Sequence, residues 1–199
     1  MGESNNNECE WFTICDEKHI LLEKNDNNMY KISFSISSTN EEDTVLNVLK
    51  NGQLFELLSQ LNPDVIDNII VKEHGGIDHI FITFKNNKEN DENDDKIVDV
   101  YFSLTYTFEE NKCIISSQNK KNHSDDYKEH EELIHKVKNK SGKKYLHVSK
   151  IKFKAVEKNN KTSVCIIFKV ESKKSNNIIN MYIGLYFKKI FYRFKKYFE

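Results

Sequence analysis

The sequence predicts an α+β domain in which a curved antiparallel sheet of about nine strands holds one long C-terminal helix. The first observation behind this prediction is the alternation of apolar and polar residues in many short segments, which is typical of half-buried strands. The second is a pair of short helical segments that follow the third strand. The third is the final segment, residues 175–198, where apolar residues recur at helical spacing over most of the circumference.

Nine segments have the pattern of strands. In residues 29–37, Tyr30, Ile32 and Phe34 alternate with polar residues, so one face of this strand is expected to be buried. The HGGI sequence at 74–77 separates two such segments and indicates a hairpin turn. The predicted strands are residues 11–14, 19–23, 29–37, 68–73, 78–85, 97–108, 112–118, 145–155 and 163–170.

Two short helices are predicted between the third and fourth strands. Thr39 and Glu42 have the spacing of a capping box, so the first helix is expected to begin just after them. The Asn-Gly pair at 51–52 is expected to end this helix. The second helix covers residues 53–61, and the Asn-Pro pair at 62–63 stops it.

The C-terminal helix is apolar over most of its circumference, so we expect it to be buried on more than one side. It is the only predicted element long enough to cover the apolar face of the sheet. A curved sheet around such a helix leaves a space that is typical of a ligand cavity. Lys188 and Lys195 lie opposite the main apolar stripe and are expected to face outward. The stripe comprises Ile179, Tyr182, Ile183, Tyr186, Phe187, Ile190, Phe194 and Tyr197.

We expect one domain over residues 10–199, since a chain of 199 residues is ordinary for a single domain. Residues 1–9 are polar and are predicted to form a disordered tail. Two polar segments of low complexity, near residues 86–96 and 119–143, are predicted to be insertions into this domain.

Charge is divided unevenly along the chain. Residues 1–110 carry 23 acidic side chains and 8 lysines, a net charge of −15, whereas residues 111–199 carry a net charge of +14. One explanation is composition, because 29 of the 30 basic residues are lysines, as an AT-rich genome would produce. The other is a basic surface that meets an anionic partner. The total of −1 does not favour a nucleic-acid partner.

Several segments resemble the START domain, the StAR-related lipid-transfer module of the helix-grip superfamily. The order of elements matches over nearly the whole chain. The opening segment EWFTICDEKHILLEK resembles the first hairpin of the family, and TNEEDTVLNVL resembles the helix after its third strand. The segment CIIFKVESKK, followed by a helix that ends in FKKYFE, resembles the last strand and the closing helix.

The resemblance has specific departures. In NPDVID, Asp67 matches a Trp-Asp pair of the family, but Ile66 replaces the tryptophan. In VDVYFSL, Asp99 matches the acidic residue of a family strand, but Val98 replaces its arginine. In KKYLHVSKIKF, His147 stands where the family often has arginine. The resemblance therefore implies the fold and a lipid-sized cavity, without identifying the lipid.

The function predicted first is binding of a lipid or another hydrophobic ligand in this cavity, with transfer of the ligand between membranes. Lys188 and Lys195 are the candidates for transient contact with an anionic membrane surface. The candidates for lining the cavity are Phe102, Tyr106, His147, Phe153, Phe168, Ile179, Ile183, Tyr186 and Ile190.

Two alternatives remain open. A pleckstrin-homology-like binding or scaffold module also ends in one helix, but it has seven strands and no helix pair after the third. A small helix-grip enzyme is the other alternative, with His147 or Asp99 as acid–base candidates. The chain is predicted to be non-catalytic and to need no cofactor or metal. The histidines of HEELIH are five residues apart, whereas two ligands on one helical face are four apart.

The N-terminus is polar and acidic, and no signal peptide is recognised in it. Basic residues interrupt the last helix, which makes a membrane span there unfavourable. We therefore expect a cytoplasmic protein that is peripheral on membranes.

Overall fold

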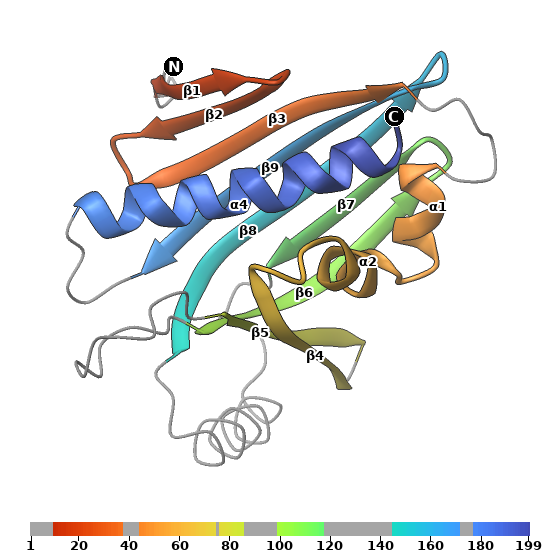
Figure 1. The fold of residues 1–199 in the computed structure, drawn as a ribbon. Coiled ribbons are helices and arrows are strands. Elements are labelled where there is room, and N and C mark those ends of the chain that lie inside the picture. The colour runs from red at the N-terminus through yellow and green to blue at the C-terminus, as the bar shows by residue number, and fades with distance from the viewer. Residues whose placement is uncertain (1–9, 38–43, 75, 86–98, 118–144, 172–176) are drawn as a thin grey trace, which may run out of the picture.

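The computed structural model describes residues 10–37, 44–74, 76–85, 99–117, 145–171 and 177–199. Nine strands form one sheet in the order β1–β2–β3–β9–β8–β7–β6–β5–β4, and all neighbours in this order are antiparallel (Figure 1). The strands are β1 (Trp11–Glu17), β2 (Ile20–Asn25), β3 (Met29–Ser37), β4 (Ile66–His74), β5 (Ile77–Phe84), β6 (Asp99–Glu109), β7 (Lys112–Ser117), β8 (Tyr145–Lys158) and β9 (Lys161–Glu171).

Three helices lie on one face of the sheet. Helices α1 (Val45–Lys50) and α2 (Leu54–Leu61) follow β3, and α4 (Asn177–Tyr197) runs lengthwise across the sheet over β3 and β9 (Figure 1). The predicted fold class is confirmed: a curved antiparallel sheet with two short helices after the third strand and a long C-terminal helix. Nine strands within the described residues, together with the helix pair, exclude the pleckstrin-homology-like alternative.

The hairpins are made by residues that tolerate a left-handed backbone. The β8–β9 turn consists of Asn159 and Asn160, both with positive φ, which matches the two-residue turn whose twist suits antiparallel strands. In the β1–β2 turn, Lys18 and His19 adopt the same conformation. The β2–β3 turn is stabilised by Asn25, whose Oδ1 accepts hydrogen bonds from the backbone N–H groups of residues 27 and 29.

Helix α1 begins with a different cap from the one predicted. Thr44 is the N-cap residue, and its Oγ1 accepts a hydrogen bond of 3.2 Å from the backbone N–H of Asn47. The predicted capping pair, Thr39 and Glu42, lies outside the described residues. Gly52, with φ of 69°, ends the first helix as predicted.

The sheet is strongly bent around its short strand β7. Beyond the end of β7, β6 and β8 pair directly and in parallel, with Asp99 opposite Tyr145 and Tyr101 opposite His147. This pairing brings two strands together that are otherwise separated by β7, so the sheet closes around the end of that short strand.

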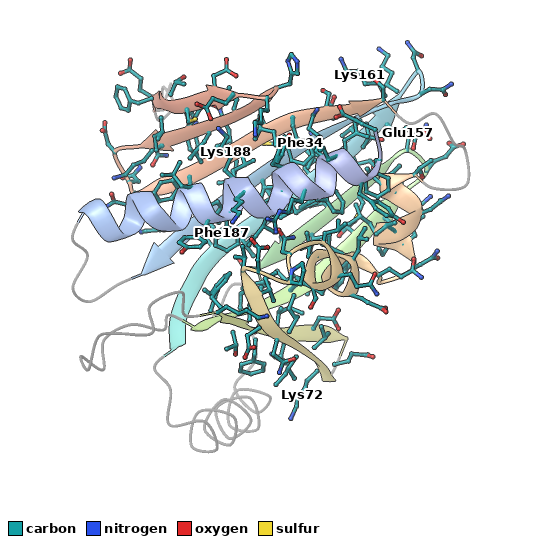
Figure 2. All side chains as sticks on the ribbon, viewed as in Figure 1. Phe34, Lys72, Glu157, Lys161, Phe187 and Lys188 are labelled. Atoms are coloured by element: carbon teal, nitrogen blue, oxygen red, sulfur yellow. The ribbon has the colours of Figure 1, made fainter. Side chains whose placement is uncertain are left out.

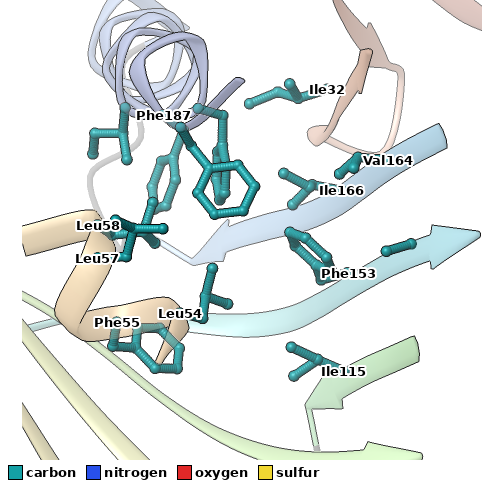
Figure 3. Packing of buried hydrophobic residues seen from close by; sticks show 14 of the residues in the cluster. Ile32, Leu54, Phe55, Leu57, Leu58, Ile115, Phe153, Val164, Ile166 and Phe187 are labelled. Atoms are coloured by element: carbon teal, nitrogen blue, oxygen red, sulfur yellow. The ribbon is translucent and has the colours of Figure 1, made fainter. Parts of the chain in front are cut away.

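The core lies between the helices and the concave face of the sheet. Leucines of α2 and Phe187 of α4 meet over Phe153 and Ile166 (Figure 3). From the sheet, the core also takes the inward-facing residues of the alternating strands, as predicted for β3, where Tyr30, Ile32, Phe34 and Ile36 are buried.

The predicted tail, residues 1–9, and the predicted insertions near 86–96 and 119–143 lie outside the described residues. All of the described elements between residues 10 and 199 belong to the one nine-stranded sheet or to the helices that cover it.

Candidate ligand-binding site

The C-terminal half of α4 packs tightly on the sheet through aromatic rings. The ring centroid of Phe187 lies 4.6 Å from that of Phe168 on β9. Phe191 lies 6.2 Å from Phe153 on β8 and 6.4 Å from Phe34 on β3. Aromatic pairs at these distances are in contact, so this half of the helix leaves little space for a ligand.

Further towards its N-terminus, α4 approaches the sheet closely at Gly184. A Cβ atom at this position would lie 2.9 Å from Cδ1 of Tyr30, which is closer than side chains tolerate. The Tyr30 ring is itself stacked on Phe168, with centroids 5.4 Å apart. Glycine therefore allows the helix backbone to lie directly against a tyrosine ring.

The hydroxyl group of Tyr30 is buried and has no hydrogen-bond partner among the described residues. Burial raises the pKa of Tyr30 to about 12. A buried polar group without a partner costs free energy, so such a group is unusual in an otherwise apolar core. The alternation pattern assigns Tyr30 to the core and does not predict it as a site residue. In the sequence, Tyr30 differs from the other inward-facing residues of this strand only in carrying a hydroxyl group.

An exposed apolar surface lies beside this contact. Tyr186 is 43% exposed and Leu185 is 37% exposed, although both lie within the buried helix. The Tyr186 ring is 6.4 Å from that of Phe84, a half-buried residue at the end of β5. Tyr186 and Phe84 lie between α4 and the β5 side of the sheet, and we call these two side chains, together with the exposed Leu185 on the same helix turn, the rim. Leu185 falls outside the helical stripe and was not predicted as a site residue.

The predicted cavity residues therefore have different surroundings. Phe102, Phe153, Phe168 and Ile190 are buried in the core, which agrees with their expected inward orientation. Tyr186 is 43% exposed, with Phe84 as its ring neighbour on the sheet, and its role in lining a cavity stays a prediction. The backbones of His147, Ile179 and Ile183 lie in β8 and α4, and their side chains are outside the described part of the structure.

Tyr106 lies near the end of β6 and takes part in a polar contact. Its hydroxyl donates a hydrogen bond to the carboxylate of Asp78, and burial, followed by this contact, raises the pKa of Tyr106 well above its ordinary value. Its ring is also stacked against Phe108, with centroids 6.1 Å apart. Tyr106 is thus half-buried and partnered at the margin of the core.

The prediction that Lys188 and Lys195 face outward is wrong. Lys188 is 9% exposed and Lys195 is 4% exposed. The first hairpin lies against the flank of α4 that the helical stripe leaves open, and Nζ of Lys188 lies 2.7 Å from Sγ of Cys15 on β1 (Figure 2). Lys195 donates to the carboxylate of Glu199 at the end of the chain. Both lysines are buried because α4 is also covered outside its apolar stripe, by the first hairpin at Lys188 and by the end of the chain at Lys195.

Exposed lysines instead gather on the convex face of the sheet. Along β8, Lys150, Lys152 and Lys154 alternate with buried or half-buried residues and point away from α4. Lys158 and Lys161 extend this row around the β8–β9 hairpin, where Lys161 is seen at the tip (Figure 2). Among the described residues, none of these lysines forms an ion pair. We call these five residues the convex lysine row.

A shallow groove of about 680 Å³ lies beside the convex lysine row. It crosses the outer face of β2, β3, β9 and β8, where the register places Ser33 opposite Cys165 and Ser35 opposite Ser163. Lys154 and Lys161 also line it, and none of its lining residues is acidic. The groove is open to solvent and has a mixed polar and apolar lining.

An ion pair ties α4 to the loop after α2. Asp64 accepts hydrogen bonds from both guanidinium nitrogens of Arg193, with 2.9 Å from Nη2 to Oδ2, and Lys189 lies 3.1 Å away. The hydrogen bond from Arg193 holds the pKa of Asp64 well below its usual range, and the same contact raises the pKa of Arg193. Arg193, the single arginine of the chain, thus positions the helix.

Among the described residues, no group of three or more His, Cys, Asp and Glu side chains is arranged to hold a metal ion. His130 and His135 of HEELIH lie outside those residues. No helix in the described segments is both long enough and apolar enough to cross a bilayer.

The comparisons with known proteins bear on the fold. No protein-family model and no curated protein sequence matches the chain. Solved structures do match the chain. The lipid transfer and protein localization domain of human StarD13 (DLC2) matches with a TM-score of 0.61 at 10% identity, over 96% of this chain and 90% of that one.

Two further human structures are similar. STARD10 matches with a TM-score of 0.61 at 14% identity, over 95% of this chain and 74% of that one. StAR-related lipid transfer protein 5 matches with a TM-score of 0.56 at 6% identity, over 97% of this chain and 88% of that one. Since the identities are low, the likeness concerns the fold. The chain has a divergent START-like helix-grip fold.

Proposed function

We propose that the chain is a non-catalytic domain that binds a lipid or another hydrophobic ligand between α4 and the sheet, and that the ligand enters beside the rim. The observation that carries this proposal is the exposure of Leu185 and Tyr186 on a helix whose next turn is fully packed. Large apolar side chains in contact with water at the edge of a core are typical of a binding site.

The packing of α4 restricts where a ligand can lie. Contacts of Phe187, Phe191 and Phe194 occupy the space under the C-terminal half of the helix. We place the ligand instead beside Tyr30 and the rim. There an acyl chain would leave water at a gain of roughly 0.8 kcal/mol per buried CH₂ group. The hydroxyl of Tyr30, which has no partner within the described part of the chain, would offer the polar end of a ligand one hydrogen-bonding partner.

The similar structures support this proposal by analogy. Two of them carry lipid transfer in their names, and the third shares the same module name. Fold alone does not specify function, so the support comes from the fold together with the apolar rim. Transfer between membranes is the further step of the proposal, and a fluorescent-lipid exchange assay between vesicles tests it.

Native mass spectrometry of the purified full chain tests ligand binding. We expect a co-purifying mass that organic extraction removes. Tyr186→Asp places a charge in the rim and should weaken the affinity for the ligand about tenfold, equivalent to about 1.4 kcal/mol, and so lower the bound fraction. The matched control is Tyr197→Asp, because Tyr197 is 53% exposed on the same helix but lies at its C-terminal end, about three turns from Tyr186.

The outcomes separate the possibilities. Loss of the bound mass in Tyr186→Asp, with retention in Tyr197→Asp, supports entry beside the rim. Equal loss in both variants would overturn the assignment of the rim. If the chain carries no mass and takes up none of a panel of lipids added from vesicles, the ligand-binding proposal is wrong.

We further propose that anionic membranes are met by the convex lysine row, instead of by Lys188 and Lys195. Five exposed lysines lie together on this face, without an acidic partner among the described residues. Each lysine near an anionic surface contributes about 1 kcal/mol. Through this contact, the convex face of the sheet would hold a cytoplasmic protein at the membrane. The rim, on the other side of the sheet, would stay accessible.

Sedimentation with phosphatidylserine-containing vesicles tests this surface. Lys152→Glu with Lys154→Glu should weaken binding at least about thirtyfold, since two lysines together contribute about 2 kcal/mol. The control is Lys72→Glu with Lys85→Glu, which makes the same charge change, with Lys72 on β4 at the far edge of the sheet (Figure 2). Equal losses in the two double variants would mean that net charge, and not this face, determines binding.

A further inference from the structure

A lysine, a cysteine and a glutamate meet where the first hairpin contacts α4. Nζ of Lys188 lies 2.7 Å from Sγ of Cys15 and 3.5 Å from the carboxylate of Glu17. Lys188 is almost completely buried, whereas Cys15 is half-buried on the edge strand β1. The register of β1 shifts between Thr13 and Cys15, so the cysteine stands at an irregularity in the strand.

The separation of nitrogen and sulfur is the informative quantity. A distance of 2.7 Å is at the short limit for a hydrogen bond between nitrogen and oxygen, although sulfur is a larger atom than oxygen. It is also too long for a direct bond, since even two sulfur atoms bond at about 2.0 Å. One small atom bonded to both would span this distance.

We propose that oxidation joins Lys188 and Cys15 through a single oxygen atom, as a nitrogen–oxygen–sulfur bridge between α4 and β1. Burial holds the amine of Lys188 next to the thiol, so the two groups already have the proximity that a bond between them requires. The amine must lose its ammonium proton to react, and the carboxylate of Glu17 is close enough to accept it.

Hydrogen peroxide is the oxidant in this proposal. One molecule converts the thiol to a sulfenic acid and releases water. A second molecule supplies the remaining two-electron oxidation. The amine loses one hydrogen from nitrogen and the sulfenic acid loses the hydrogen of its hydroxyl group, so that nitrogen and oxygen bond to form the N–O–S linkage. The peroxide takes up both hydrogens and leaves as two molecules of water. In total, the amine, the thiol and two peroxides give the bridge and three waters. Two molecules of a dithiol reverse it, returning amine, thiol and one water.

The bridge would fasten the edge hairpin to the helix that covers the core. Residues 15 and 188 are 173 positions apart, so the bond closes most of the chain into a loop. A cross-link of this kind restricts the unfolded chain and should raise the melting temperature. If α4 moves when a ligand enters, the bridge would also slow entry, and this last consequence alone rests on the proposed function.

Peptide mapping of the full wild-type chain by mass spectrometry tests the proposal. After exposure to peroxide and alkylation of free thiols, we expect the peptides of Cys15 and Lys188 to appear as one species. Its mass should be the sum of the two plus one oxygen and minus two hydrogens. Dithiothreitol should restore both peptides, and the melting temperature should fall on reduction.

Matched variants identify the partners. Cys15→Ser and Lys188→Arg should abolish the species, the second while keeping the positive charge beside Glu17. Cys165→Ser and Lys189→Arg should retain it, because Cys165 is a second half-buried cysteine and Lys189 is the exposed neighbour of Lys188. The peptide map of the wild-type chain does not depend on whether any variant folds, and it does not depend on a bound ligand.

Three results would overturn the proposal. One is Cys15 recovered only as alkylated thiol, sulfinic acid or disulfide, with Lys188 free. Another is a linked species that lacks the extra oxygen, which would mean a direct sulfur–nitrogen bond. The third is an unchanged yield of the species in Lys188→Arg.

Discussion

Gly184 of α4 lies against the ring of Tyr30, where a Cβ atom would come within 2.9 Å of Cδ1. The ring cannot move aside easily, because it is buried and stacked on Phe168. The position of the helix above β3 therefore depends on the absence of one methyl group.

Gly184→Ala should destabilise the domain. Overpacking of a core typically costs about 1–3 kcal/mol, whereas replacing a helical glycine by alanine gains about 1 kcal/mol. We expect a net loss of up to about 2 kcal/mol, measured by urea unfolding. The double variant with Tyr30→Leu should recover stability relative to the sum of the two single changes. Additive effects would show that the two residues do not interact.

Tyr30→Phe should leave the ligand-free domain as stable or make it more stable, because it removes a buried hydroxyl for which the described segments provide no partner. The same change should weaken ligand binding if that hydroxyl contacts the ligand. Thermal melts with and without added lipid measure both effects. A clear loss of stability in the ligand-free protein would mean that the hydroxyl has a partner.

Phe194→Ala should cost about 3–5 kcal/mol, because Phe194 is completely buried between the rings of Phe191 and Phe198. This is a large part of the stability of an ordinary domain. Tyr197→Ala is the control, and it should cost only about 1 kcal/mol, because this half-exposed ring packs on one side, against Phe198. Similar losses in chemical denaturation of the two variants would contradict the packing described for α4.

Acid should weaken the contact between α4 and the loop after α2. The pKa of Asp64 is lower in the folded chain than the value of about 3.9 expected in the unfolded chain. The stabilisation is therefore present above about pH 4 and is lost as the pH falls further. Since Asp64 is half-exposed, we expect less than about 1 kcal/mol.

Unfolding of Asp64→Asn at pH 7 and at pH 2.5 measures this contribution. The variant should differ from wild type at pH 7 and converge with it in acid. Asp67→Asn, an exposed carboxylate on β4 with no ion pair among the described residues, should show no such convergence. A constant difference across the pH range would assign the effect of Asp64 to something other than its charge.

The fold could be predicted because its signals are local. Alternation in residues 29–37 gives the buried face of β3, and Gly52 ends α1 through its own backbone conformation. The start of α1 at Thr44 could not be distinguished from a capping pair five residues earlier, because several polar residues there can cap a helix.

The candidate site was less predictable, because helical periodicity identifies the faces of a helix and not their neighbours. Lys188 was expected in solvent, but the first hairpin covers that flank of α4. Tyr186 belongs to the apolar stripe, yet it is 43% exposed, with Phe84 at the end of β5 as its ring neighbour. Both outcomes depend on contacts between segments more than 100 residues apart in the sequence.

The order of strands has a further consequence for the charge distribution of the molecule. The chain is acidic in its first part and basic in its last, but β8 and β9 lie between β3 and β7, near the middle of the sheet. Strands of the acidic part thus flank the basic ones on both sides. The pattern in space resembles a quadrupole, with little dipole moment along the strand order. A charged surface would therefore select a face of this molecule, while its two ends would be electrostatically alike.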